Sequence, residues 1–156
     1  MISINIVCVG NLKEKYWKDA IQEYSKRISA FAKINVIEVK ESVYGTSQSE
    51  ILIAKRDESD RLEKYKSNYN VALEINGNNY SSEKFAGHIS NLMTQGYSSI
   101  SFFIGGSHGL DEKFSTSLNE QLSFSNFTFP HQLMRVILVE QIYRAFTIIN
   151  NKTYHK

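Results

Sequence analysis

The sequence Ile104-Gly105-Gly106-Ser107-His108-Gly109 directly follows an apolar run and has the composition of a loop that contacts a ligand. Glycines allow a backbone to approach a bound molecule closely, because no side chain intervenes. The loop matches neither the G-x-G-x-x-G dinucleotide fingerprint nor the G-x-x-x-x-G-K-S/T phosphate loop. Two interpretations remain equal from this pattern alone: a loop that contacts a ligand, and a tight strand-to-helix turn that needs a positive φ.

A second candidate is the run Phe124-Ser125-Asn126-Phe127-Thr128-Phe129, which mixes aromatic rings with hydroxyl and amide groups. As a loop it would have free main-chain N–H and C=O groups. Such a surface holds a purine between apolar side chains and binds its edge through the main chain. The alternative is an edge strand whose aromatic rings point into the core, and the pattern alone favours that alternative.

Other kinds of catalytic site find little support. The four histidines are scattered along the chain at His88, His108, His131 and His155. No Cys–His or His–carboxylate pair has the spacing of metal ligands, so no metal site is expected. A serine nucleophile is not expected either, because Ser107 has no identifiable base and no G-x-S-x-G motif occurs. Cys8 lies in an apolar run, which favours a buried, inert thiol.

Residues 131–146 predict a helix with almost no polar face, beginning just after Pro130, the only proline. A helix that is apolar all round is buried on all sides. We expect a second copy of the chain to cover part of it, since 156 residues have trouble surrounding one helix. Glu140 and Arg144, spaced i,i+4, are expected to pair. Arg135 is expected to meet either a phosphate or the C-terminal tail.

The elements that position these residues follow from periodicity and turn signals. Strands are predicted at residues 2–9, 34–39, 71–75, 100–104 and 121–124. Helices are predicted at residues 13–31, 49–65 and 81–96, from 111 onward, and after 130. Residues 76–79, Asn-Gly-Asn-Asn, predict a turn. Alternating strands and helices indicate one α/β domain over residues 1–156, with a mainly parallel sheet covered by helices on both faces.

In such sheets ligands bind outside the carboxyl ends of the strands. Three loops qualify: the one after Ile75, the one after Ile104, and residues 124–129.

Composition indicates a soluble globular protein: 42% of the residues are hydrophobic and 22% charged. No apolar run is long enough to cross a bilayer, so no membrane is expected as a partner. With one cysteine and no signal peptide, the cytoplasm is expected. The net charge is only +2, but residues 13–27 and the C-terminal part are both basic. Two solvated faces explain this, and a polyanionic partner is compatible with it.

One family resemblance covers essentially the whole chain. It is carried by VGNLKEKYW, LEINGNNYSSEKFA, FFIGGSHGL, LSFSNFTFPHQLMRVILVEQIYRAF and the terminal YHK. These segments resemble the RlmH family, and its staphylococcal members in particular. That family consists of SPOUT-class methyltransferases that use S-adenosylmethionine to methylate N3 of a pseudouridine in 23S ribosomal RNA. The resemblance implies a SPOUT fold with a C-terminal trefoil knot, and a homodimer packed through the C-terminal helix.

The resemblance also implies which residues form the site. The cofactor-binding positions would be Leu73, Gly105, Phe124, Ser125, Asn126, Phe127, Thr128 and Phe129. The tail would close over the site, so the catalytic candidates are His155, Tyr154 and Arg144, with His131 a weaker one. His155 is the first candidate for the base that N3 deprotonation needs.

The methyl group is already activated by the sulfonium charge, so no metal is required. The implied partner is 23S ribosomal RNA, within the assembled ribosome. Two alternatives remain open: a SPOUT methyltransferase for another RNA nucleoside, and a non-catalytic dimer that binds RNA or the ribosome.

Overall fold

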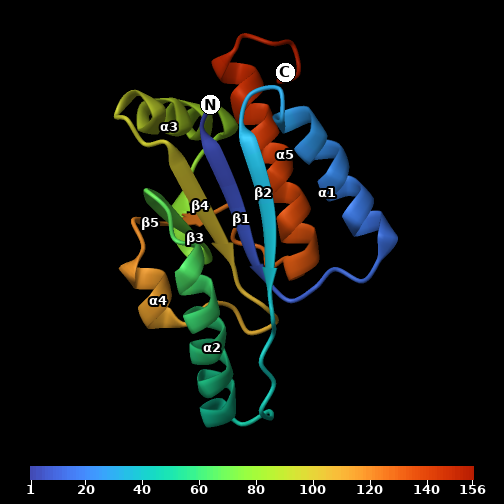
Figure 1. Cartoon of the computed structure of the whole chain (residues 1–156), viewed down its shortest axis with the longest axis vertical. Helices are drawn as coiled ribbons and strands as arrows, with labels where there is room; N and C mark the ends of the chain where they lie inside the picture. Colours follow the sequence, from blue (N-terminus) through green and yellow to red (C-terminus); the bar gives the residue numbers. More distant parts are fainter.

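The computed structural model describes all 156 residues and has a five-stranded sheet at its centre (Figure 1). The strands are β1 (Ser3–Val9), β2 (Lys33–Val39), β3 (Tyr69–Asn79), β4 (Ser99–Ile104) and β5 (Glu120–Ser123). Their order is β2-β1-β4-β3-β5, and every neighbouring pair is parallel. All carboxyl ends therefore meet at one edge of the sheet, as the sequence predicted.

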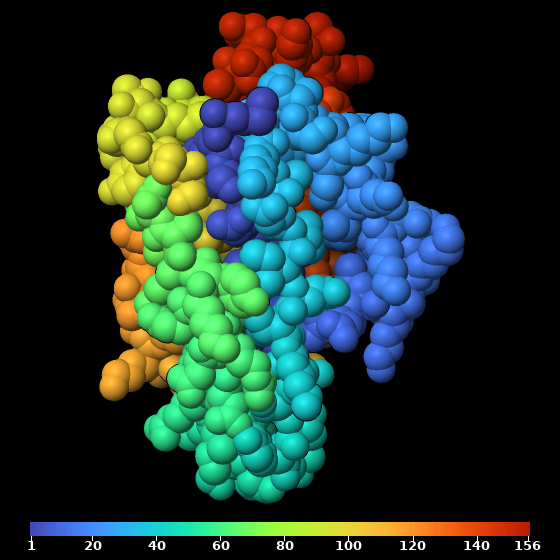
Figure 2. All heavy atoms as spheres, in the orientation of Figure 1, coloured from blue at the N-terminus to red at the C-terminus, as the bar shows by residue number.

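Helices cover both faces of this sheet. They are α1 (Lys15–Ile28), α2 (Gln48–Leu62), α3 (Ser82–Thr94), α4 (Glu112–Ser117) and α5 (His131–Ile149), with a 3-10 turn at Glu63–Tyr65. None of them is long and apolar enough to cross a bilayer. In the space-filling view α2 and the segment before it project from the body of the molecule (Figure 2).

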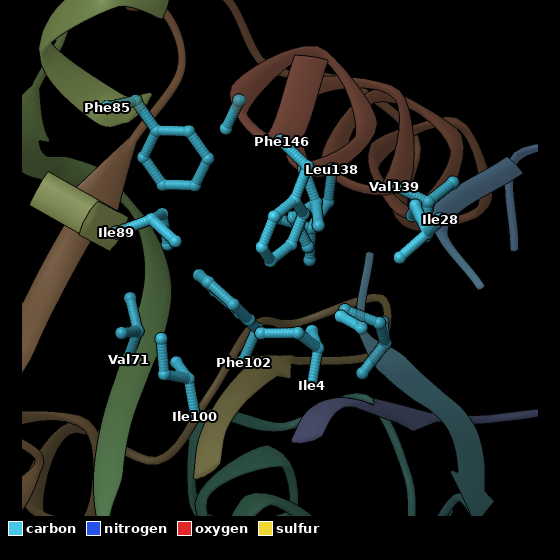
Figure 3. Close-up of a cluster of buried hydrophobic side chains, with 14 of the residues drawn as sticks. Ile4, Ile28, Val71, Phe85, Ile89, Ile100, Phe102, Leu138, Val139 and Phe146 are labelled. Atoms are coloured by element: carbon cyan, nitrogen blue, oxygen red, sulfur yellow. The ribbon is translucent and has the colours of Figure 1, made fainter. Parts of the chain in front are cut away.

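Alternation along the strands divides the core in two. Even-numbered residues of β1 face a cluster of 22 buried residues beneath α1, α3 and α5, and Val7 and Val9 face a cluster of nine beneath α2 and α4. Figure 3 shows the larger cluster, with Phe85 and Ile89 from α3 and Phe146 from α5 above the sheet residue Phe102. The helix α5 lies between α1 and α3, so one chain covers two of its sides.

The predicted turn at residues 76–79 is wrong, because β3 continues through it to Asn79. Leu73 and Asn78 both pair with Leu122, so the residues between them form a bulge. A Cβ on Gly77 would lie 2.7 Å from main-chain atoms of Gln121 and Leu122. Glycine and asparagine serve here to bring β3 close to β5: the Asn79 side chain donates a hydrogen bond to the Ser123 carbonyl at 3.0 Å.

Candidate active site

An open cleft lies at the carboxyl ends of β3, β4 and β5, against the first turn of α5. It encloses about 580 Å³ of empty space, including solvent at its mouth. It is lined by Leu73, Glu74, Ile75, Ile104, Gly105, Gly109, Leu122, Ser123, Phe124, Ser125, Phe127, Thr128, Phe129, His131 and Met134. The apolar lining with a few polar groups is typical of a small-molecule site. Two of the three predicted loops, the one after Ile104 and residues 124–129, therefore meet in one cleft, and Leu73, Glu74 and Ile75 of β3 join them there.

Gly105 is a position in the cleft where no other residue fits. A Cβ there would lie 2.4 Å from the Gly109 carbonyl carbon and 2.6 Å from the Leu110 nitrogen. The loop folds back on itself, with the Gly109 N–H donating to the Gly106 carbonyl at 3.0 Å and Gly109 at φ +81°. The interpretation as a tight turn with a positive φ is confirmed, and contact with a ligand stays a prediction for a loop whose Gly105 and Gly109 line the cleft.

The aromatic run is a loop, so its interpretation as an edge strand is wrong. The strand β5 ends at Ser123, and Phe127 is 79% exposed at the cleft. Ser125 braces the loop: its hydroxyl accepts from the Phe127 N–H at 3.0 Å, and its carbonyl accepts from the Ser123 hydroxyl at 3.0 Å. Phe124 packs against Phe85 of α3, with ring centroids 6.4 Å apart. An anchored loop with an exposed ring is suited to cover a ligand.

Of the residues predicted to bind the cofactor, all but one line this cleft; Asn126 does not. Glu74, Met134 and Gly109 also line the cleft, and although none was predicted individually, each lies within or beside a predicted segment. His131 is also part of the lining. Its place as the first residue of α5, directly after the aromatic loop, was the available signal.

The expectation that Arg135 meets a phosphate or the tail is wrong, because its side chain is bonded inside the fold. Its side chain is fully buried, and its Nη1 lies 2.6 Å from Oε2 of Glu38. Its Nη2 donates to the carbonyls of Val9 and Gly10 at 3.1 and 2.9 Å. Arg135 therefore ties the start of α5 to the ends of β1 and β2, since a buried guanidinium needs several acceptors.

The predicted pairing of Glu140 with Arg144 is confirmed: Nε of Arg144 donates to Oε1 of Glu140 at 3.0 Å. The tail packs onto this pair. The Tyr154 hydroxyl donates to Oε1 of Glu140 at 3.1 Å, and Nη1 of Arg144 lies 3.1 Å from Nδ1 of His155. Burial raises the pKa of Tyr154 to about 12, and the bond to Glu140 acts in the same direction. Tyr154 is therefore a hydrogen-bond donor near neutral pH.

His155 also contacts α3, where its Nε2 lies 2.7 Å from Oε1 of Glu83. That contact lowers the pKa of the Glu83 carboxyl. None of the tail residues lines the cleft of the same chain. Met134 lines the cleft, and Arg144 lies ten residues further along α5, about 15 Å at 1.5 Å per residue. Figure 1 shows the C-terminus at the amino end of the sheet, away from the cleft.

Residues 2–155 match the model of a family described as "Predicted SPOUT methyltransferase". The chain belongs to this SPOUT methyltransferase family. The match covers β1 to the tail, so the SPOUT assignment applies to the cleft, to α5 and to His155 together. The predicted SPOUT fold class is confirmed, while the trefoil knot stays a prediction.

Individual relatives agree with the SPOUT assignment. The chain is 52% identical to ribosomal RNA large subunit methyltransferase H of Finegoldia magna, covering 99% of this chain and all of that protein. It is 46% identical to the protein of the same name from Fusobacterium nucleatum, with the same coverage. A solved structure of a probable methylase family protein from Haemophilus influenzae aligns with a TM-score of 0.56 at 11% identity, covering 98% of this chain and 70% of that one. The last similarity concerns the fold alone.

Proposed function

We propose that the protein uses S-adenosylmethionine to methylate N3 of a pseudouridine in 23S ribosomal RNA, within the ribosome and hence in the cytoplasm. The observation that carries the proposal is the cleft at the carboxyl ends of β3, β4 and β5, in a chain of the SPOUT family. The printed names of its full-length relatives specify ribosomal RNA of the large subunit. The pseudouridine and its N3 atom come from the RlmH resemblance.

The residues of the cleft fit the adenosine part of this cofactor. Only a glycine fits at residue 105, because the loop folds back onto Gly109 and Leu110, and Gly105 and Gly109 both line the cleft. Leu73 and the rings of Phe124, Phe127 and Phe129 supply flat apolar contacts. Main-chain groups of residues 124–129 would bind the edge of a purine, as adenine sites in other proteins do. When bound, the sulfonium supplies an activated methyl group, and the protein's contribution is chiefly to orient the acceptor.

A second copy of the chain completes the site in this proposal. Arg144, onto which His155 of the tail packs, lies about 15 Å along α5 from Met134 in the cleft of its own chain. On the outward side of α5, Leu133, Val136 and Ile137 are only partly covered by the chain itself. Two chains packed through α5 in opposite directions would bring the tail of each, with Tyr154 and His155, to the cleft of the other. A closed dimer of this kind buries the same surface on both subunits.

The RNA partner is supported by charge and by the relatives' names. Basic residues outnumber acidic ones on α1 and the segment before it: Lys13, Lys15, Lys18, Lys26 and Arg27 against Glu14, Asp19 and Glu23. Lys13 precedes the helix, and Lys15 and Lys18 lie in its first half. Such a basic surface attracts a phosphate backbone. It is small, so a composite ribosomal surface suits it better than free RNA.

Calorimetric titration with S-adenosylmethionine separates the enzyme from a non-catalytic RNA-binding dimer. The proposal expects saturable binding that is competed by S-adenosylhomocysteine. It also expects the methyl group to reach pseudouridine when ribosomes lacking the modification are added. Binding of ribosomes without any binding of the cofactor would favour the non-catalytic dimer. Transfer to a different nucleoside would favour a SPOUT methyltransferase with another target.

A further inference from the structure

A second, polar cavity lies beside the cleft, at the carboxyl ends of β1 and β2. It encloses about 1390 Å³ of empty space, solvent at its mouth included, and none of its lining residues is hydrophobic. Its lining combines polar and basic side chains with three carboxylates: Asn11, Lys13, Lys40, Ser107, His131 and Gln132, together with Glu14, Glu38 and Glu41 and the backbone of Gly10. Amides, a hydroxyl and ammonium groups are the donors and acceptors that bind the edges of a nucleobase and its phosphates.

His131 is the one residue that lines both the cleft and the polar cavity. Its Nδ1 is buried and has no hydrogen-bond partner in the chain. Buried polar atoms are nearly always paired, so this unpaired nitrogen needs an explanation, and a ligand bound against the His131 ring, which lines both hollows, would supply one. Arg135, in the next turn of α5, is bonded to β1 and to Glu38, which ties the end of the helix that carries His131 to the sheet.

The surroundings keep the His131 imidazole neutral. Burial lowers its pKa, the positive charge of Arg135 lowers it further, and Glu41 acts in the opposite direction. Glu38 shares the cavity but is paired with Arg135, while Lys13, Glu14 and Lys40 also line it. The N-terminal end of α5, where His131 lies, also disfavours a positive charge. A neutral imidazole has a free lone pair and is able to accept a proton.

From these observations we infer that the polar cavity is the acceptor site, and that His131, in the wall between the two hollows, takes the proton from N3 of the target pseudouridine. The inference rests on the proposed function and extends it. An imidazole nitrogen of His131 binds the N3 proton, and the N3 electron pair forms the bond to the methyl carbon. The carbon–sulfur bond breaks, and its electron pair remains on sulfur. The proton then leaves His131 for water through the open cavity.

In this arrangement the tail of the partner has a different task from His131. Tyr154 and His155 hold the target nucleoside in place and exclude water, whereas His131 performs the proton transfer. Lys13 and Lys40, both exposed at the cavity mouth, contact phosphates of the same RNA segment. Asn11, Ser107 and Gln132 offer donors and acceptors to the uracil-like edge of the base.

The first test replaces His131 by Gln and, separately, by Ala, and measures single-turnover methylation of ribosomes lacking the modification. A lost general base lowers the rate by about 10²–10⁴-fold. Added imidazole should restore part of the rate of His131→Ala, and both variants should lose the low-pH limb of the wild-type rate profile. Calorimetry measures the cofactor affinity of each variant separately, and single turnovers at saturating cofactor then report the loss of the base alone. Thermal unfolding identifies a variant that fails to fold, and in that case the rate of the other variant tests the role of His131.

A second test concerns the cavity and uses lysines at the two ends of one strand. Lys40 follows the carboxyl end of β2 and lies at the cavity, whereas Lys33 begins β2 at the other end. We expect Lys40→Gln to weaken binding to unmethylated ribosomes severalfold and Lys33→Gln to leave it unchanged. Equal effects of both would reject the cavity as the acceptor site.

The inference and the proposed function fail in different ways. A wild-type protein that binds no S-adenosylmethionine refutes the proposed function. The role of His131 alone is refuted if the wild type methylates pseudouridine and both His131→Gln and His131→Ala do so at the same rate and with the same pH profile.

Discussion

The buried guanidinium of Arg135 and the carboxylate of Glu38 lie 2.6 Å apart, and they join α5 to the end of β2. Oε2 of Glu38 also accepts the Leu12 N–H at 2.8 Å, so the segment before α1 is held by the same carboxylate. Three elements that are distant in the sequence are thus fixed at the sheet edge where the cleft and the polar cavity lie. The pair positions the site without lining the cleft.

We therefore predict that Arg135→Met destabilises the fold by about 3 kcal/mol, at the low end of values for breaking a buried ion pair, because Glu38 is a third exposed. The variant leaves two carbonyl groups and a carboxylate without their donor. Urea denaturation measures the change. Lys15→Met, which removes an exposed pair with Asp19, is the control and should cost less than about 1 kcal/mol. Equal costs for both variants would contradict the structural role of Arg135.

Gly105→Ala is predicted to lower cofactor affinity at least about tenfold, or 1.4 kcal/mol. The added methyl group would lie within 2.7 Å of main-chain atoms of Gly109 and Leu110, so the loop must move. Gly87→Ala is the matched control: nothing lies within 4 Å of its Cβ, and it sits in α3, where alanine gains up to about 1 kcal/mol over glycine. The shift of melting temperature on adding S-adenosylmethionine measures the effect. A full shift for Gly105→Ala would show that the loop does not form the binding wall.

Stability should fall as the pH drops below the ordinary histidine pKa of about 6.5. Burial lowers the pKa of His131 in the folded chain, so the unfolded chain binds more protons in that range. The destabilisation is absent above the pKa of His131 in the unfolded chain, and it grows as the pH falls toward the pKa of His131 in the folded chain. Denaturation of the wild type and His131→Gln between pH 5 and 8 tests this, a range of about three units around the ordinary pKa. A slope that the substitution does not reduce would contradict the burial of a neutral His131.

Deleting Tyr154 to Lys156 should abolish methylation while leaving cofactor binding, dimer and fold intact, because the tail lies outside the cleft of its own chain. If two chains share each site, mixing this deletion with Gly105→Ala should restore activity. Random pairing gives half mixed dimers with one intact site each, or about a quarter of wild-type activity. No recovery in confirmed mixed dimers would place the tail at the cleft of its own chain.

The parallel sheet, and the meeting of the loop after Ile104 with residues 124–129, followed from periodicity and from a general rule about strand ends. The sequence was less informative where one residue type serves two purposes. Gly77 and its asparagines have turn chemistry, yet they allow β3 to pass within contact distance of β5. Arginine is a residue type that often binds phosphate, yet the acceptors of Arg135 come from β1 and β2, more than 90 residues away in the sequence.

The candidate site shows the same limit. The aromatic run was ambiguous because six residues of alternating character suit both a strand and a loop, and only the end of β5 at Ser123 decides between them. The role of His131 depends on two hollows that share one wall, which no local pattern encodes.

The most direct test of the account is mass spectrometry of 23S ribosomal RNA from ribosomes that lack the modification, incubated with this protein and S-adenosylmethionine carrying a labelled methyl group. The account predicts one labelled methyl group on a pseudouridine, attached at N3. The account would be contradicted by a labelled methyl group on any other atom or nucleoside. It would also be contradicted if ribosomes from a strain lacking the gene for this protein received no label.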